Sequence, residues 1–209
     1  MAVQLGTPEL MSIAATLGWA SGLRLYAVLF LTGLAGHLGW VPLPAGLQWL
    51  QQPLVMGASG VMLAAEFFAD KIPGFDSFWD LMHTFVRIPA GAALAAAVFG
   101  GDETTWAAVA AIVGGSLAAT AHTAKATTRA AVNTSPEPFS NWGLSLAGDA
   151  AVPAMLWLAW SEPGVAAWVL AALAVAMLGL TVWLLHHLRS LLRGLVRRFS
   201  APRPAADSA

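Results

Sequence analysis

Hydrophobic runs long enough to cross a lipid bilayer recur along this chain, separated by short polar stretches. A helix that spans a bilayer needs about 17–25 largely apolar residues. Six runs approach that length, and they cover residues 11–38, 54–69, 78–99, 104–129, 142–160 and 165–188. The pattern therefore predicts an all-α protein, a polytopic transmembrane helical bundle with about six spans.

The first run contains an arginine, Arg24, near the middle of an otherwise apolar stretch. Gly18 and Gly22 precede it and form a GxxxG pair. In membrane proteins such a pair either lets a neighbouring helix approach closely or marks a broken helix. In both cases the sequence places Arg24 close to the centre of the bilayer.

The composition agrees with a membrane location. Hydrophobic residues make up 58% of the chain and charged residues 10%, whereas a soluble domain has about 25% charged residues. The formal net charge of −1 lacks the basic excess of a nucleic-acid-binding protein, so we expect no such partner. The chain has no cysteine, which excludes disulfides, thiolate metal sites and cysteine nucleophiles.

Lysine and arginine predict the orientation, because cytoplasmic loops carry an excess of these residues. The end of the chain is expected in the cytoplasm, since the tail after the last run contains Arg189, Arg193, Arg197, Arg198 and Arg203. Counted back across six helices, the N-terminus is cytoplasmic as well. The chain then divides into one transmembrane domain, residues 1–190, and a basic, then Pro/Ala-rich cytoplasmic tail, residues 191–209.

The short loops alternate in charge as this orientation requires. The inside loops lie beside lysines and arginines, and the outside loops are acidic or uncharged. The inside loops cover residues 70–77 and 135–141, and the outside loops cover residues 39–53, 100–103 and 161–164.

Ten charged residues lie in or beside the hydrophobic runs. A charge within a bilayer is costly and normally faces a protein interior or a water-filled cavity. Five of the ten are basic and five are acidic, a balance that favours paired charges around a shared interior over a pore of one sign. They are Arg24, Lys71, Arg87, Lys125, Arg129, Glu66, Asp70, Asp76, Asp80 and Asp149.

Most of these residues recur at helical spacing, so each group is expected on one face of a helix. Glu66 and Asp70 are four residues apart, and a turn with a helix-breaking proline, Pro73, follows them. Three further groups also recur at helical spacing and each forms a stripe along one helix. The first stripe is mostly acidic, the second is mostly basic, and the third lies on the helix that follows the second. The three stripes are Asp76-Asp80-His83-Arg87, His122-Lys125-Arg129-Asn133 and Asn141-Ser145-Asp149.

The leading hypothesis is a small inner-membrane transporter or channel-like permease for a small anionic solute, with proton coupling as one option. Buried carboxylates and histidines are the side chains suited to proton exchange. The expected substrate-binding residues are Arg24, Lys125, Arg129, His122 and Asn133. The expected proton or cation relay consists of Glu66, Asp70, Asp80, His83, Arg87 and Asp149. A protomer of 209 residues is small for alternating access, so we expect a homodimer.

Two alternatives remain open. One is a metal-dependent membrane enzyme or carrier that acts on a phosphorylated lipid at the cytoplasmic leaflet, with a divalent cation held by Asp76, Asp80 and His83. The other is a non-transporting scaffold, which predicts paired charges and no cavity. No GxSxG or HExxH motif occurs, so no catalytic residue is assigned and a role other than catalysis is favoured.

Several sequence elements carry a family resemblance. The most specific is Glu66-Phe67-Phe68-Ala69-Asp70-Lys71-Ile72-Pro73, followed by Asp76, Asp80 and Arg87. Further elements are Ser21-Gly22-Leu23-Arg24, Gly114-Gly115, His122, Lys125, Arg129 and Asn133-Thr134-Ser135-Pro136. Together they resemble the bacterial domain-of-unknown-function 4126 family, over most of residues 18–149. The resemblance implies a small multi-pass protein of the bacterial inner membrane, and it implies no particular activity.

Overall fold

The computed structural model describes residues 5–72, 74–101, 103–133 and 138–199, and it confirms the predicted helical bundle. Only helices and their connections occur in this described part. The helices are α1 (Thr7–His37), the short 3-10 helix η1 (Ala45–Gln51), α2 (Pro53–Ala69), α3 (Phe75–Phe99), α4 (Thr104–Val132), α5 (Pro138–Ser161) and α6 (Pro163–Phe199). Parts of three predicted loops lie outside the described residues, namely residues 73, 102 and 134–137.

Five helices, α1 and α3 to α6, have the length and apolar composition of a membrane span. A sixth span results if η1 and α2 are counted together, with a bend of 70° between them. The six predicted runs coincide with α1 to α6 and differ from them mainly at the ends. The predicted tail begins inside α6, which continues to Phe199, and residues 200–209 lie outside the described part.

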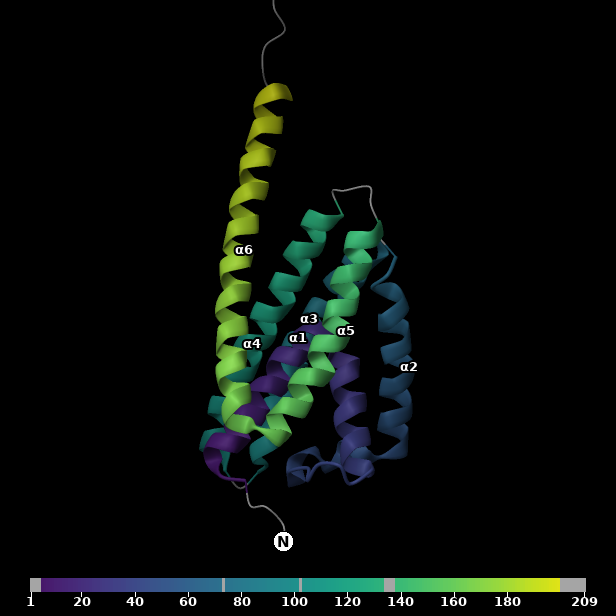
Figure 1. The fold of residues 1–209 in the computed structure, drawn as a ribbon, viewed down its shortest axis with the longest axis vertical. Helices are drawn as coiled ribbons and strands as arrows, with labels where there is room; N and C mark the ends of the chain where they lie inside the picture. Colours follow the sequence, from purple (N-terminus) through teal and green to yellow (C-terminus); the bar gives the residue numbers. More distant parts are fainter. Residues whose placement is uncertain (1–4, 73, 102, 134–137, 200–209) are drawn as a thin grey trace, which may run out of the picture.

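The helix α1 folds back on itself at Arg24, whose backbone angles are non-helical (φ −146°, ψ 76°). Ser12, near its start, donates a hydrogen bond of 2.7 Å to the carbonyl of Pro163, at the turn between α5 and α6. Ala35, near its end, lines a small pocket with Trp160, beside the same turn. In a straight helix Ser12 and Ala35 would lie about 35 Å apart. Thus α1 is a re-entrant hairpin with Arg24 at its tip, as the two purple arms in Figure 1 show.

This hairpin explains why the predicted path of the chain needs correction. The start of α1 and the C-terminal end of α6 lie at opposite ends of the bundle (Figure 1), whereas six full crossings would place both termini on one side. An apolar hairpin and a single span have the same hydropathy, so the sequence pattern does not distinguish them. Of the two alternatives for Gly18 and Gly22, the broken helix is therefore present.

The close-packing alternative is also present. A Cβ atom at Gly18 would overlap the backbone of Gly114 in α4, and one at Gly22 would overlap the backbone of Ala118. A Cβ atom at Gly91 of α3 would lie 3.1 Å from the carbonyl oxygen of Gly18. Glycine at these positions thus brings α1, α3 and α4 into backbone contact, which positions the Arg24 tip against α4.

The outer surface is apolar and the interior is charged. Leu54, Phe85 and Trp168 are 82%, 82% and 81% exposed, as expected for side chains that face lipid. By contrast, Asp70 and Arg87 are fully buried. The apolar outer surface agrees with an integral membrane protein whose charged residues are shielded from lipid.

A buried network of ten charges

Asp70 is the centre of the candidate functional site. It is the C-terminal cap of α2 and is fully buried. Its Oδ2 lies 2.7 Å from Nη1 of Arg24 and 3.0 Å from Nζ of Lys125. Its Oδ1 accepts a hydrogen bond of 2.8 Å from Nη1 of Arg129. One carboxylate therefore joins the tip of α1, the end of α2 and two turns of α4.

Asp80 of α3 forms a second centre. Its Oδ1 lies 2.6 Å from Nη1 of Arg87 and 3.1 Å from Nζ of Lys125, and its Oδ2 lies 3.5 Å from Nη1 of Arg129. Arg87 uses its other terminal nitrogen, Nη2, for a 2.6 Å bond to Oε1 of Glu66. Lys125 and Arg129 therefore link the two aspartates into one network.

Asp149 extends the network to α5. Its Oδ1 lies 2.9 Å from Nη2 of Arg24, and its Oδ2 lies 3.2 Å from Nζ of Lys71. The same Arg24 nitrogen also donates to the backbone carbonyl and to the hydroxyl of Ser145, at 3.1 and 3.0 Å. Ser145 received no site role from the sequence, although its spacing from Asp149 was a sufficient signal.

Asp76 completes the set through Arg129 at 3.7 Å and Asn133 at 3.1 Å. The ten charged residues predicted to share an interior thus form one connected network of ten ion pairs, which are Arg24–Asp70, Arg24–Asp149, Lys71–Asp149, Arg87–Glu66, Arg87–Asp80, Lys125–Asp70, Lys125–Asp80, Arg129–Asp70, Arg129–Asp76 and Arg129–Asp80.

The two histidines assigned to the site lie at its edges. His122 is in hydrogen-bond contact with the Thr84 hydroxyl at 2.7 Å, and its Nδ1 lies 3.5 Å from Nη1 of Arg87. His83 contacts the carbonyl of Trp79 at 2.8 Å and the hydroxyl of Tyr26 at 3.2 Å. His83 therefore has contacts of its own and makes no ion pair with the acids of the described network.

The predicted divalent-metal site is not assembled. Asp76 accepts hydrogen bonds from the backbone of Gly74 and Ser77, at 2.9 and 2.6 Å, whereas Asp80 is paired with Arg87 and Lys125. Among the described residues, no group of three histidine, aspartate or glutamate side chains is arranged to hold a metal ion. Residues four apart on a helix share a face but lie about 6 Å apart along its axis, and here each finds a nearer partner.

Lys125 also supplies a hydrogen-bond donor to the backbone at the break in α1. Its Nζ donates a hydrogen bond of 3.1 Å to the carbonyl of Leu23, the residue before Arg24. A helix that breaks inside a bilayer leaves backbone carbonyls without their helical partners, and each must find another donor. The ammonium that links Asp70 and Asp80 thus stabilises the re-entrant tip as well.

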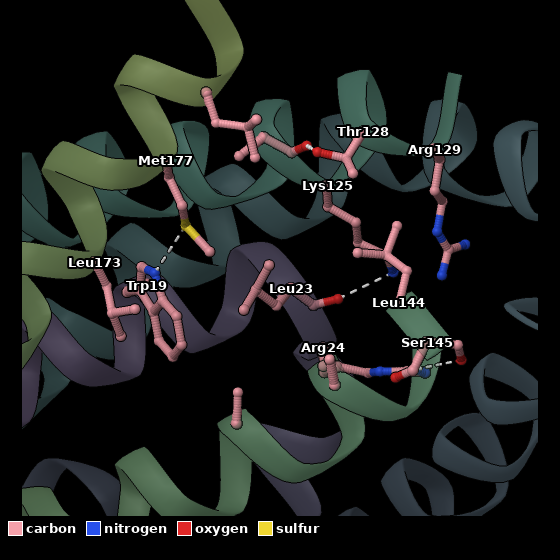
Figure 2. Close-up of a pocket in the computed structure, with 15 residues that line it drawn as sticks. Trp19, Leu23, Arg24, Lys125, Thr128, Arg129, Leu144, Ser145, Leu173 and Met177 are labelled. Carbon is pink, nitrogen blue, oxygen red and sulfur yellow. Dashed lines mark hydrogen bonds between the residues drawn. The ribbon is translucent and has the colours of Figure 1, made fainter. Parts of the chain in front are cut away.

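A cavity of about 230 Å³ reaches this tip between α4, α5 and α6. Arg24, Lys125 and Arg129 line its charged side, and Figure 2 shows Trp19, Leu173 and Met177 on the opposite side. Trp19 donates a hydrogen bond from its indole nitrogen to the sulfur of Met177, at 3.3 Å. The remaining lining is Leu23, Ala124, Thr128, Leu144, Ser145, Ala147, Gly148, Ala151 and Leu180.

Comparison with protein families agrees with the resemblance noted in the sequence. A family model described as "Domain of unknown function (DUF4126)" matches residues 11–186. The chain belongs to the DUF4126 family. The match covers the α1 hairpin from Met11 onward and all ten residues of the charge network. No curated protein and no solved structure matches the chain.

The network of this DUF4126 protein has a defined chemical capacity. Its five basic and five acidic side chains balance, so a bound anion would add negative charge that no basic side chain of the network compensates. Some buried polar atoms also have no hydrogen-bond partner in the described part of the chain, although buried polar groups are normally hydrogen-bonded. They include Oε2 of Glu66, Nε of Arg129 and both amide atoms of Asn141. Of the residues named here, Arg129 lines the cavity, and Glu66 and Asn141 do not.

Proposed function

We propose that this membrane protein transports a small anionic solute and that a proton moves together with the anion. The observation that carries the proposal is a cavity that ends at Arg24, a buried arginine on the tip of a re-entrant helix. Arginine recognises carboxylate and phosphate groups through paired hydrogen bonds. The substrate-binding residues are Arg24, Lys125 and Arg129, and His122 and Asn133 lie at the edge of their network.

Charge balance provides the reason for coupling to a proton. An anion that binds Arg24 must compete with Asp70 and Asp149, which both contact this side chain. The displaced carboxylate keeps its other basic partners, but the balanced network then holds an excess negative charge in an apolar interior, which costs several kcal/mol unless a proton neutralises it. Of these two carboxylates, Asp149 is the one that a proton from water reaches more directly, because its side chain is 21% exposed whereas Asp70 is fully buried.

The remaining acids and Arg87 form the relay in this proposal. Glu66, Asp70 and Asp80 are joined through Arg87 and Lys125, so a change at one carboxylate alters the partners of the next. The non-helical residue in α1 offers a hinge at the point where the anion binds. Movement of this tip would exchange the partners of Arg24 and expose the site alternately.

The proposal includes an orientation and an oligomeric state. The end of the bundle that carries Lys71 and the C-terminal part of α6 faces the cytoplasm of a bacterial inner membrane, because it contains the basic residues. The start of α1 then lies on the opposite face of the membrane, since α1 returns to the side where it begins (Figure 1). The protomer is small for a transporter, so we expect a homodimer.

The alternatives are less well supported. A scaffold predicted paired charges without a cavity; the charges are paired, but a cavity reaches Arg24. A metal-dependent enzyme needed a site at Asp76, Asp80 and His83, and the described residues do not assemble one. A carrier for a phosphorylated lipid needs no such metal site and is compatible with anion transport.

The test is flux through proteoliposomes that contain the full-length protein and a lumenal pH-sensitive dye. Inward gradients of inorganic phosphate, succinate and octyl phosphate are applied in turn. At least one anion should drive proton movement in the wild type and in Glu162→Gln, a matched control at the exposed turn between α5 and α6. Arg24→Ala and Asp80→Asn should abolish it while retaining a monodisperse gel-filtration profile. Proton movement that is absent for every anion, or equal in all variants, would overturn the proposal.

A further inference from the structure

The cavity beside Arg24 has two chemically different ends. Arg24, Lys125 and Arg129 lie at one end, together with the hydroxyl of Ser145. Trp19 and Met177 lie at the other end, where the indole nitrogen of Trp19 donates a hydrogen bond to the sulfur of Met177. A small hydrophilic anion would use the first end and would leave the apolar walls without a partner.

The rim of the cavity lies at the level of the membrane. Ala147 and Leu180 line it and are exposed on the surface of the bundle. They belong to the membrane-span candidates Phe139–Ser161 and Pro163–His187, away from the ends of both segments. An opening at this height faces lipid, so a ligand with an apolar chain has a direct path into it.

The volume sets a limit on the ligand. Pockets for complete drug-sized ligands hold about 300–1,000 Å³, and this cavity holds about 230 Å³. It therefore has room for an anionic headgroup and the first part of one chain. The rest of that chain would extend through the rim, past Ala147 and Leu180, into the bilayer.

From these three observations we infer that the ligand of this site is an anionic amphiphile with a single alkyl chain next to its headgroup. Its carboxylate or phosphate binds Arg24, and its first methylene groups lie between Trp19, Leu144 and Met177. The inference rests on the proposed function, because it assigns a substrate class to the same anion site. It differs from the proposed function because it requires an apolar chain on the transported anion.

Calorimetric titration of the full-length protein in detergent tests this inference with soluble probes. Two pairs of probes are compared, one for each headgroup. Inorganic phosphate is compared with octyl phosphate, and acetate is compared with octanoate, so each pair differs in its alkyl chain. Each methylene that becomes buried should strengthen binding by about fourfold, so the alkyl member of at least one pair should bind at least tenfold more tightly. Octyltrimethylammonium, with the same chain and the opposite charge, reports uptake by the micelle and should show no saturable binding.

A pair of variants isolates the apolar part of the cavity. Ala147→Trp fills the rim, whereas Ala150→Trp adds the same side chain to an exposed position of α5 outside the cavity. Ala147→Trp should weaken binding of the alkyl probe at least tenfold, and Ala150→Trp should leave it unchanged.

The outcomes separate this inference from the proposed function. Equal affinities for short and alkyl anions, or equal effects of the two tryptophans, would overturn the amphiphile and leave an Arg24-dependent anion site intact. If no probe showed saturable binding, or if Arg24→Ala left the binding unchanged, both the amphiphile and the proposed function would be refuted. Tight binding of octyl phosphate alone would assign a phosphorylated lipid, and tight binding of octanoate alone would assign a fatty acid.

Discussion

The guanidinium Nη1 of Arg24 lies 2.7 Å from Oδ2 of Asp70, and this ion pair joins the tip of the α1 hairpin to the end of α2. Both side chains are almost completely buried, at 2% and 0% exposure. A buried charge whose partner is removed is strongly destabilising, whereas a complete pair is tolerated. The pair therefore links the shape of α1 to the integrity of the network.

Asp70→Asn is expected to destabilise the protein more than any other single neutralisation in the network. It leaves Arg24, Lys125 and Arg129 without their shared carboxylate, and removal of one partner from a buried ion pair costs about 3–5 kcal/mol. Thermal unfolding in detergent measures the effect, with Glu162→Gln as the exposed control. A melting temperature equal to that of the control would show that Asp70 is not the centre of the network.

Arg24→Lys should preserve the fold and impair transport. A lysine ammonium is a single point charge and does not reproduce the planar guanidinium that contacts Asp70, Asp149 and Ser145 together. A hydrogen bond to a charged group contributes about 1.5–3 kcal/mol, so anion-driven proton flux should fall by about 10- to 100-fold. Wild-type flux in Arg24→Lys would indicate that only the positive charge matters.

The re-entrant path of α1 is testable because the chain contains no cysteine. Gly6→Cys and Glu103→Cys should react with a membrane-impermeant maleimide applied from outside intact cells. Both positions are exposed, and they cap α1 and α4, which begin at the same end of the bundle (Figure 1). Ser77→Cys lies in the first turn of α3, which begins at the opposite end of the bundle (Figure 1), and it should react only after permeabilisation. If Gly6→Cys behaved like Ser77→Cys, α1 would cross the membrane completely.

Two glycines that differ only in their surroundings test the packing that holds the α1 hairpin. An added Cβ at Gly114 would overlap Ala95 of α3, whereas one at Gly57 of α2 meets nothing within 4 Å. Gly114→Ala should destabilise the bundle by about 1–3 kcal/mol through overpacking. Gly57→Ala should stabilise it by up to about 1 kcal/mol through helix propensity. Equal melting temperatures would exclude backbone contact between α1, α3 and α4 as a determinant of stability.

The alternation of apolar runs and polar turns was sufficient to predict the helices and the membrane class. The ten charged residues were also identifiable from the sequence, because a charge in an apolar run has to be buried against other protein groups. Their spacing along each helix correctly placed Lys125 and Arg129 on one face, where they contact the same two aspartates. These features are local, so the order of residues alone determines them.

The pairing of those charges and the reversal of α1 required the tertiary structure. A hydropathy profile reports how apolar a segment is, and it does not report whether the segment crosses the membrane or turns back. A hairpin with Arg24 at its tip therefore resembles a single span in sequence. Spacing places Asp76, Asp80 and His83 on one helix face, but their partners come from helices distant in sequence. Here Asp76 contacts Asn133, Asp80 contacts Lys125, and His83 contacts Tyr26. The cavity at Arg24 likewise exists only because α1 approaches segments of α4, α5 and α6 that lie far from it in the sequence.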